Sequence, residues 1–197
     1  MTPLLLRLGL GLLLALPWPA APVLAADTSN AVILVAKRNL QGPYGSTIVL
    51  ARPLDAGRHV GVIINKPTQM RLGSLFPNHE PSRKVVDPVF LGGPMGSEVI
   101  FALVQRKDSP GNRSLQIAPG LYLATDSSVV DRIIESEPGQ ARFFAGVVVW
   151  QPGELNEELK RGVWFVQEPR SELVLRKSTE GMWEEMVNRL ERLAKMI

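Results

Sequence analysis

The feature of this sequence that most constrains its fold is a series of short apolar runs, rich in β-branched residues and separated by turn residues. The longest run covers residues 142–150 (RFFAGVVVW), and an early one covers residues 31–36 (AVILVA). Runs of this length and composition are typical of buried β-strands. By the same criteria, further strands are predicted at residues 47–51, 60–64, 88–91, 99–104, 115–117, 121–124 and 164–166.

Turn residues predict how some of these strands pair. Pro53, Asp55 and Gly57 separate the strands at 47–51 and 60–64, which therefore form a predicted hairpin. Pro119 and Gly120 separate a second predicted pair, 115–117 and 121–124. The stretch Asn65-Lys66-Pro67 is expected to end the strand at 60–64, because Pro67 cannot donate to a sheet ladder. Residues 78–87 are polar and contain proline, which predicts a loop.

Two longer segments have the periodicity of amphipathic helices. The first covers residues 127–137, with Asp126 or Ser127 as its N-cap. The second covers residues 179–196, and its predicted apolar side consists of Met182, Met186, Leu190, Leu193 and Ile197. On this last helix, Glu185–Arg189 and Glu191–Lys195 are predicted ion pairs. Shorter helices are predicted at 72–76 and 154–161.

The order of these elements predicts the fold class. Strands dominate the first hundred residues after residue 30, and strands and helices mix later, which does not match a regular βαβ series. We therefore expect an α+β fold, with a single compact domain over residues 31–197. This domain should contain a large mixed β-sheet, flanking helices and a C-terminal amphipathic helix.

The first 25 residues have the organisation of a secretory signal peptide. Arg7 precedes a leucine-rich block, prolines follow, and the chain then reaches small residues at Ala25. The uninterrupted apolar run at 8–16 is nine residues, whereas a membrane-spanning helix needs about 20. We predict cleavage near Ala25, a short polar leader at 26–30 and a periplasmic or secreted protein without a stable membrane anchor. If the leader does not function, the protein is cytoplasmic.

Composition narrows the chemistry of the chain. The absence of cysteine excludes cysteine nucleophiles, thiolate metal sites and iron–sulfur clusters. The 22 basic residues exceed the 19 acidic residues by little, and the basic pairs are scattered, whereas phosphate binding needs a concentrated basic face. Nucleic acid is therefore not an expected partner of the exported protein, and the ligand or protein partner is left open.

Motifs for catalysis or metal binding are incomplete. The chain has two histidines, His59 and His79, and both are predicted to be surface residues. It has neither a nucleophile elbow, a phosphate loop, a His-Glu-x-x-His motif nor a carboxylate-rich calcium loop. The sequence therefore predicts no catalytic residue, no metal site and no cofactor.

Two glycine motifs lead from strands into turns, at residues 61–67 (GVIINKP) and 91–94 (LGGP). Glycines let backbone N–H groups approach an anion, and Lys66 adds a positive charge. The alternative is that these glycines serve tight turns and close strand approach.

A third motif completes a resemblance to a known family. It begins at Phe144-Ala145-Gly146 and continues through Trp150, Gly153, Glu154 and Trp164. The three motifs, in this order, resemble the YqgE/AlgH family over most of residues 31–197. The resemblance implies a compact α+β domain with a large mixed sheet. It also marks a candidate binding surface made of Gly61, Asn65, Lys66, Pro67, Gly92, Gly93, Pro94, Trp150, Gly153, Glu154 and Trp164.

Three functions follow from these observations. The leading hypothesis is a non-enzymatic binding or accessory domain exported to the periplasm. The first alternative is a cytoplasmic transcriptional regulator, the description often given to YqgE/AlgH proteins. It requires the leader to be inactive, because an exported protein cannot contact the chromosome. The second alternative is a hydrolase that uses Ser, Asp or Glu without a recognisable sequence signature.

Overall fold

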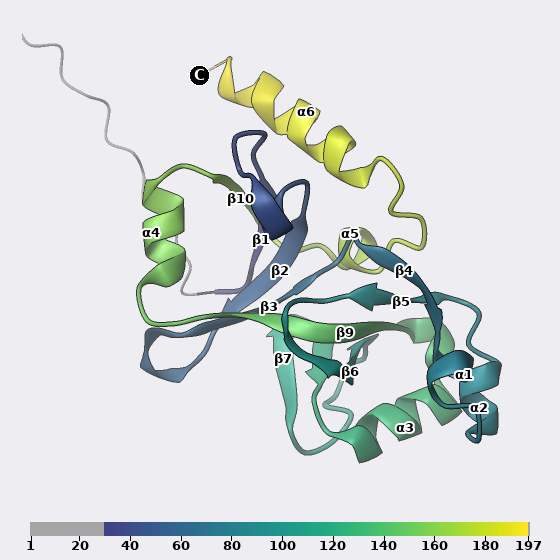
Figure 1. Cartoon of the computed structure of the whole chain (residues 1–197). Coiled ribbons are helices and arrows are strands. Elements are labelled where there is room, and N and C mark those ends of the chain that lie inside the picture. Colours follow the sequence, from purple (N-terminus) through teal and green to yellow (C-terminus); the bar gives the residue numbers. More distant parts are fainter. Residues whose placement is uncertain (1–29, 197) are drawn as a thin grey trace, which may run out of the picture.

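The computed structural model describes residues 30–196, so the predicted signal peptide (1–25) and residues 26–29 lie outside the described part. Within that part, ten strands form one strongly curled sheet with helices around it (Figure 1). The strands are β1 Val32–Ala36, β2 Ile48–Pro53, β3 His59–Ile63, β4 Pro67–Arg71, β5 Pro88–Leu91, β6 Met95–Gln105, β7 Ser114–Ala118, β8 Leu121–Ala124, β9 Ala141–Trp150 and β10 Trp164–Gln167.

Six α-helices and three short 3₁₀-helices accompany the sheet in residues 30–196. They are α1 Leu72–Leu75, α2 Glu80–Arg83, α3 Ser127–Ser136, α4 Glu154–Lys160, α5 Ser171–Val174 and α6 Met182–Ala194, with η1 Gly42–Tyr44, η2 Asp55–Gly57 and η3 Pro138–Gln140. The predicted α+β class, with its C-terminal helix, is confirmed. No helix in this described range has the length and apolar character needed to cross a membrane.

The sheet is mixed, as predicted. Its main path runs β10-β1-β2-β3-β9-β6-β8-β7 and is antiparallel throughout, while β5 pairs in parallel with β9 and antiparallel with β4. The two predicted hairpins, β2–β3 and β7–β8, are both present. The central strand is β9, which joins β3 to β6 although these strands lie far apart in the sequence.

The curl of the sheet encloses the main core. The sheet bends until β7 approaches β2, where the Arg52 side chain donates to the backbone carbonyl of Gln116. Apolar side chains on the inner face, together with those of α6, form one cluster that includes Ile48, Leu50, Val62, Leu103, Leu123, Phe144, Met186 and Val187. Burying such a side chain contributes about 1.5–3 kcal/mol. This burial is the main stabilisation of a domain that has no disulfide.

Two smaller clusters cover the outer face of the sheet. One packs α3 on β6, β8 and β9 through the buried face of the helix, Val129, Val130, Ile133 and Ile134. The other places Leu155 of α4 beside Trp150 and Trp164. The predicted cap of α3 is also present, since the Asp126 carboxylate accepts a hydrogen bond from Ser128 N at 3.0 Å. Helices on both faces therefore hold the sheet in its curled form.

Along β9 the side chains alternate between the two faces, and the alternation shifts at Gly146. Phe144 and Val147 both pack in the inner cluster although they are three positions apart. Gly146 has a φ of 72°, which glycine adopts without a Cβ clash, and the register between β9 and β6 shifts at the same place. This β-bulge puts Arg142 and Phe144 on the inner face while Val147 stays there too.

Next to this bulge, the end of β5 inserts between β3 and β9. Gly92 N donates to the carbonyl of Ala145 in β9, and the carbonyl of Gly92 accepts from Ile63 N in β3, each at 2.8 Å. A Cβ on Gly92 would overlap the carbonyl oxygen of Gly146, so this approach requires glycine. β3 pairs with β9 from His59 to Gly61, and beyond this point the insertion separates the Ile63 end of β3 from β9 and brings Phe90 of β5 to the inner face.

Several local predictions were wrong. The strand before Asn65-Lys66-Pro67 does end there, at Ile63, but the strand β4 that begins at Pro67 was not predicted. Residues 78–87 contain the single-turn helix α2 within the predicted loop. Strand β6 starts at Met95, four residues before the predicted start. These segments lack clear periodicity, and their structure depends on pairing with neighbouring strands and helices.

The last helix is shorter than predicted and pairs differently. It spans Met182–Ala194, and the predicted apolar residue Leu193 is 52% exposed, while Ile197 lies outside the described residues. Glu185 pairs with Arg176 at 2.7 Å and Glu191 with Arg38 at 3.1 Å, in place of the predicted partners within the helix. These contacts join α6 to the body of the domain, which an ion pair within one helix does not do.

Candidate functional site

The side chain of Arg142 is the most unusual feature of the inner core. It is 6% exposed, although it carries a full charge. Its Nη1 donates to the carbonyl of Val174 at 2.6 Å, and its Nη2 donates to the carbonyl of Ile64 at 2.8 Å. The guanidinium lies 3.9 Å from the ring centroid of Phe90 and 5.6 Å from that of Phe144. The arginine is therefore held in one orientation by two carbonyls and two aromatic rings.

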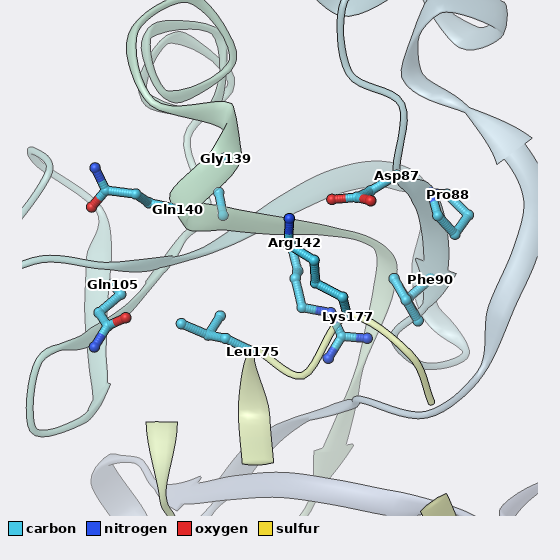
Figure 2. A pocket seen from close by; sticks show the side chains of 10 residues that line it. Asp87, Pro88, Phe90, Gln105, Gly139, Gln140, Arg142, Leu175 and Lys177 are labelled. Carbon is cyan, nitrogen blue, oxygen red and sulfur yellow. The ribbon is translucent and has the colours of Figure 1, made fainter. Parts of the chain in front are cut away.

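A small cavity opens beside this arginine, between β5, β9 and the segment after α5. Its volume is about 190 Å³, below the roughly 300–1,000 Å³ typical of pockets for drug-sized ligands. Figure 2 shows Arg142 among the lining side chains, with Asp87 and Phe90 on one side and Gln105 and Gln140 on the other. We call this space the Arg142 cavity; it is also lined by Leu175 and Lys177.

The electrostatics of the cavity follow from burial. Desolvation lowers the pKa of Arg142 from its ordinary value to about 10, and the nearby negative charge of Asp87 raises it by a smaller amount. Arg142 therefore stays protonated at neutral pH. No carboxylate among residues 30–196 lies within the 4.0 Å of an ion pair with this guanidinium. A buried cation without an ion-pair partner is costly, which makes the cavity favourable for an anion.

The predicted surface residue Asn65 serves the backbone next to this cavity. Its Oδ1 accepts from Ile48 N at 2.8 Å, and its Nδ2 donates to the carbonyl of Ser46 at 3.0 Å. Asn65 thereby fixes the end of β3 against the start of β2. Because Ile64 precedes it and its carbonyl accepts from Arg142, this motif helps to position the cavity wall.

The other residues of the two glycine motifs meet at the β5 insertion. The carbonyl of Lys66 accepts from Leu91 N at 2.8 Å, and Pro67 is paired with Phe90 in the β4–β5 ladder. The two glycine motifs are therefore adjacent in the sheet. A Cβ on Gly93 would overlap the backbone of Val147 in β9. Gly61 lies on β3, where a Cβ would come within 3.1 Å of the Trp150 ring. The glycines thus have backbone packing roles, while Lys66 is half-buried and Pro94 is exposed.

The third motif forms a separate cluster around Glu158. One carboxylate oxygen, Oε2, accepts from the indole N–H of Trp150 at 3.0 Å and from that of Trp164 at 2.8 Å. Gly153 begins α4 with a φ of 87°, and Glu154 accepts from Gln151 N at 2.7 Å. These predicted site residues therefore cap and brace α4, and they do not line the Arg142 cavity.

A shallow groove runs over this cluster and contains Tyr44. Burial and the charges of Glu158 and Glu154, in that order, raise the pKa of the Tyr44 hydroxyl above 10.0. The groove has its own acidic character, which separates it from the Arg142 cavity.

Sequence reasoning missed Arg142 as a site residue. It assigned residues 142–150 to a buried strand, which is correct, but it gave the charge at the start of that strand no role. The available signal was the charge itself, because arginine is almost never fully buried unless it is paired. Phe90, Gln105 and Leu175 gave no comparable signal, since only the tertiary fold brings them to the cavity.

The two histidines lie in different settings. His59 is 8% exposed, so its prediction as a surface residue was wrong. The His79 ring lies 2.7 Å from Ser82 Oγ through Nδ1 and 3.6 Å from Glu135 through Nε2, which has the order of a Ser–His–acid triad. Ser82, however, is fully buried, so its hydroxyl cannot reach a substrate from solvent. The contact instead holds α2 against α3.

No group of three or more His, Asp or Glu side chains in the described part of the chain is arranged to hold a metal ion. The cavity residues can bind an oxyanion through N–H donors and contact a small apolar group through Phe90 and Leu175.

The fold and the site define an α+β domain with a curled sheet, in which the end of β5 inserts between β3 and β9 and Arg142 lines a small cavity nearby. A family model described as AlgH-like matches residues 33–194, and the chain belongs to this AlgH-like family. The resemblance to YqgE/AlgH proteins predicted from three sequence motifs is therefore confirmed.

Individual relatives agree with this assignment. A UPF0301 protein of Parabacteroides distasonis is 30% identical over 163 residues, covering 80% of this chain and 81% of the relative. A UPF0301 protein of Bacteroides fragilis is 29% identical over 150 residues, covering 75% and 74%. The solution structure of the AlgH protein from Pseudomonas aeruginosa superposes with a TM-score of 0.68 at 19% identity, covering 88% of this chain and 92% of that one. A crystal structure of a Corynebacterium diphtheriae protein gives a TM-score of 0.67, also at 19% identity, covering 83% and 87%.

Proposed function

We propose that this protein is a non-enzymatic binding domain, exported to the periplasm, that holds a small ligand in the Arg142 cavity. The observation that carries the proposal is Arg142 itself. Among the described residues, two of the five N–H donors of this buried guanidinium are hydrogen bonded, and both go to backbone carbonyls. Arg142 also lines a cavity, and we propose that a ligand there satisfies the remaining donors.

The two glycine motifs support this assignment indirectly. Asn65 fixes the end of β3, and Ile64, the residue between β3 and Asn65, supplies one carbonyl to Arg142. Gly92 allows the close approach by which β5 places Phe90 against the guanidinium. Residues that looked like a binding surface in the sequence thus build the wall of a binding cavity. Lys66 and Pro94, which are accessible at the same end of β5, extend the proposed surface towards solvent.

Binding can be tested by screening a library of small neutral, cationic and anionic compounds against the purified full chain, with the melting temperature as readout. A ligand that binds only the folded state at 100 times its Kd stabilises it by about 2.7 kcal/mol. A Gly139→Trp variant should abolish the shift, because Gly139 lines the cavity and a tryptophan side chain there would block it. The backbone should accept the substitution, since a Cβ at Gly139 meets no atom within 4 Å. Asn156→Trp, on the exposed surface of α4, is the matched control. A shift that survives in Gly139→Trp would place the ligand elsewhere.

Export rests on the composition of residues 1–25 and is tested separately. Cells that express the native gene are fractionated, and the N-terminus of the recovered protein is sequenced. We expect a periplasmic protein that begins near residue 26. An intact Met1 on a cytoplasmic protein would refute export and return the cytoplasmic regulator to consideration.

A further inference from the structure

The charges around the Arg142 cavity specify the kind of ligand it suits. Arg142 and Lys177 are positive and Asp87 is negative, which leaves one positive charge in excess among the lining side chains. The guanidinium lacks an ion-pair partner within the described residues, and its burial lowers its pKa. A ligand with one negative charge would balance the cavity, whereas a dianion would exceed the balance and meet Asp87.

The shape of the bound arginine specifies the group that carries this charge. Its guanidinium lies close to the Phe90 ring, and its two backbone bonds fix the plane in which its other N–H groups point. A planar carboxylate accepts two parallel hydrogen bonds from such a guanidinium, and this bidentate geometry adds specificity to the charge attraction. A tetrahedral phosphate does not share this planarity and is often doubly charged at neutral pH.

The remaining walls limit the rest of the ligand. The cavity is about 190 Å³, so the carboxylate is followed by only a few further heavy atoms. Phe90 and Leu175 offer apolar contact, and Gln105 and Gln140 offer amides that can bind a hydroxyl or carbonyl group. Lys177 lines the cavity and is exposed, so it can attract an anion without being part of the core.

We infer that the Arg142 cavity binds a small monocarboxylate, with its carboxylate on the Arg142 guanidinium and its short polar or apolar tail between Phe90, Leu175 and the two glutamines. This inference rests on the proposed binding function and adds the ligand class to it. Lys177 assists by charge, and Asp87 excludes dianions.

The test titrates the full chain with acetate, lactate, inorganic phosphate, glycine and acetamide, and follows the NMR signal of Arg142 Nε–H. Acetamide is the neutral counterpart of acetate, so it separates charge from shape. We expect acetate and lactate to shift the Arg142 signal and to bind at least about tenfold more tightly than acetamide or phosphate, a difference of about 1.4 kcal/mol. An arginine with a purely structural role would show no such shift.

Variants separate the contributions. Arg142→Lys should weaken lactate binding at least about tenfold, because it keeps the charge and loses the bidentate geometry. If that variant does not fold, Lys177→Gln still tests the inference, because its exposed side chain is not part of the core; it should weaken lactate several-fold and reduce the salt dependence of binding. Lys107→Gln, at an exposed lysine that does not line the cavity, is the control. Asp87→Asn should tighten lactate binding by removing a negative charge.

The outcomes distinguish the inference from the proposed function. Equal binding of acetamide and acetate, or tighter binding of phosphate, would overturn the carboxylate inference and leave a binding cavity of another specificity. Tighter binding of glycine than of acetate, lost in Asp87→Asn, would also overturn it in favour of a zwitterion. If neither these probes nor any compound of the screening library binds in the cavity, both the inference and the proposed function fail.

Discussion

Two regions of this protein place one charge between two aromatic side chains, and they use it in different ways. Arg142 lies in the inner core against Phe90 and Phe144, and Glu158 lies at the rim of the sheet between Trp150 and Trp164. The indole N–H groups both donate to Glu158, so this charge is satisfied by its aromatic neighbours. The phenylalanine rings offer no conventional acceptor to the guanidinium, and two of the five Arg142 N–H donors are bonded within the described residues, both to backbone carbonyls. The comparison separates a charge that braces the fold from one that we propose for binding.

The largest effect expected from this comparison is the loss of Arg142. Arg142→Ala should lower the free energy of unfolding by about 3 kcal/mol, because two buried carbonyls lose charge-assisted bonds and the relief from burying a charge offsets only part of this loss. Urea unfolding measures the change. Arg38→Ala is the control, since Arg38 is exposed and bonded to Glu191, and it should cost less than about 1 kcal/mol. Equal losses in the two variants would show that Arg142 has no special place in the core.

A smaller loss is expected at the second charge. Glu158→Ala should cost about 2 kcal/mol, because the indole N–H groups of Trp150 and Trp164 lose their shared acceptor in a half-buried site. Glu158→Gln keeps an acceptor oxygen and should cost about 1 kcal/mol or less. Urea unfolding gives both values, and tryptophan fluorescence reports the local change. If Glu158→Ala left the stability unchanged, the cluster would not brace α4.

A substitution at the start of α4 tests the same bracing role and should cost less stability than the loss of Glu158. Gly153 has a φ of 87°, so Gly153→Ala should cost about 1 kcal/mol in thermal unfolding. Gly139→Ala is the control, because Gly139 is not in the left-handed region and a Cβ there meets no atom. That control should be neutral or slightly stabilising. A neutral Gly153→Ala would show that α4 tolerates another entry geometry.

The smallest expected effect is a pKa change in the groove beside Glu158. The pKa of Tyr44 is raised above 10.0 by burial first and by Glu158 and Glu154 next. Glu158→Gln should therefore lower the Tyr44 pKa, measured by absorbance at alkaline pH, with Tyr44→Phe separating its signal from that of Tyr122. Because unfolded Tyr44 loses its proton at lower pH than the folded residue, the free energy of unfolding should fall as the pH rises above 10.0. An unchanged titration would mean that the charge of Glu158 does not contribute to the raised pKa of Tyr44.

Much of the fold was predictable because its strands are strongly patterned. The segments at 31–36 and 142–150 are apolar and β-branched, and α3 has a complete apolar face and an N-cap, so local sequence and tertiary structure agree there. Strand β4 (PTQMR) is polar and mostly exposed, and it exists because it pairs with β5. The single-turn helices α2 and α5 are too short to show periodicity.

The site was less predictable than the fold. The sequence showed the glycine motifs and offered two roles for them, an anion site or close approach of strands. Gly92 has the second role, because it lies in close contact with the backbone of β9. The cavity was missed because its walls come from β5, β6, β9 and the segment after α5, which only the folded sheet brings together. Arg142 gave the one local signal, a charged residue at the start of an otherwise apolar strand.

The central place of β9 has a consequence for the order of folding. Every strand from β1 to β8 is synthesised before β9, yet in the pairing order of the described sheet β9 is the strand that links the β1–β2–β3 half to the β6–β8–β7 half. A nascent chain that has not reached Trp150 holds two unconnected sets of strands with their edges open. Non-local pairings of this kind form slowly. The complete sheet should therefore form only after β9 has been synthesised, close to the end of translation.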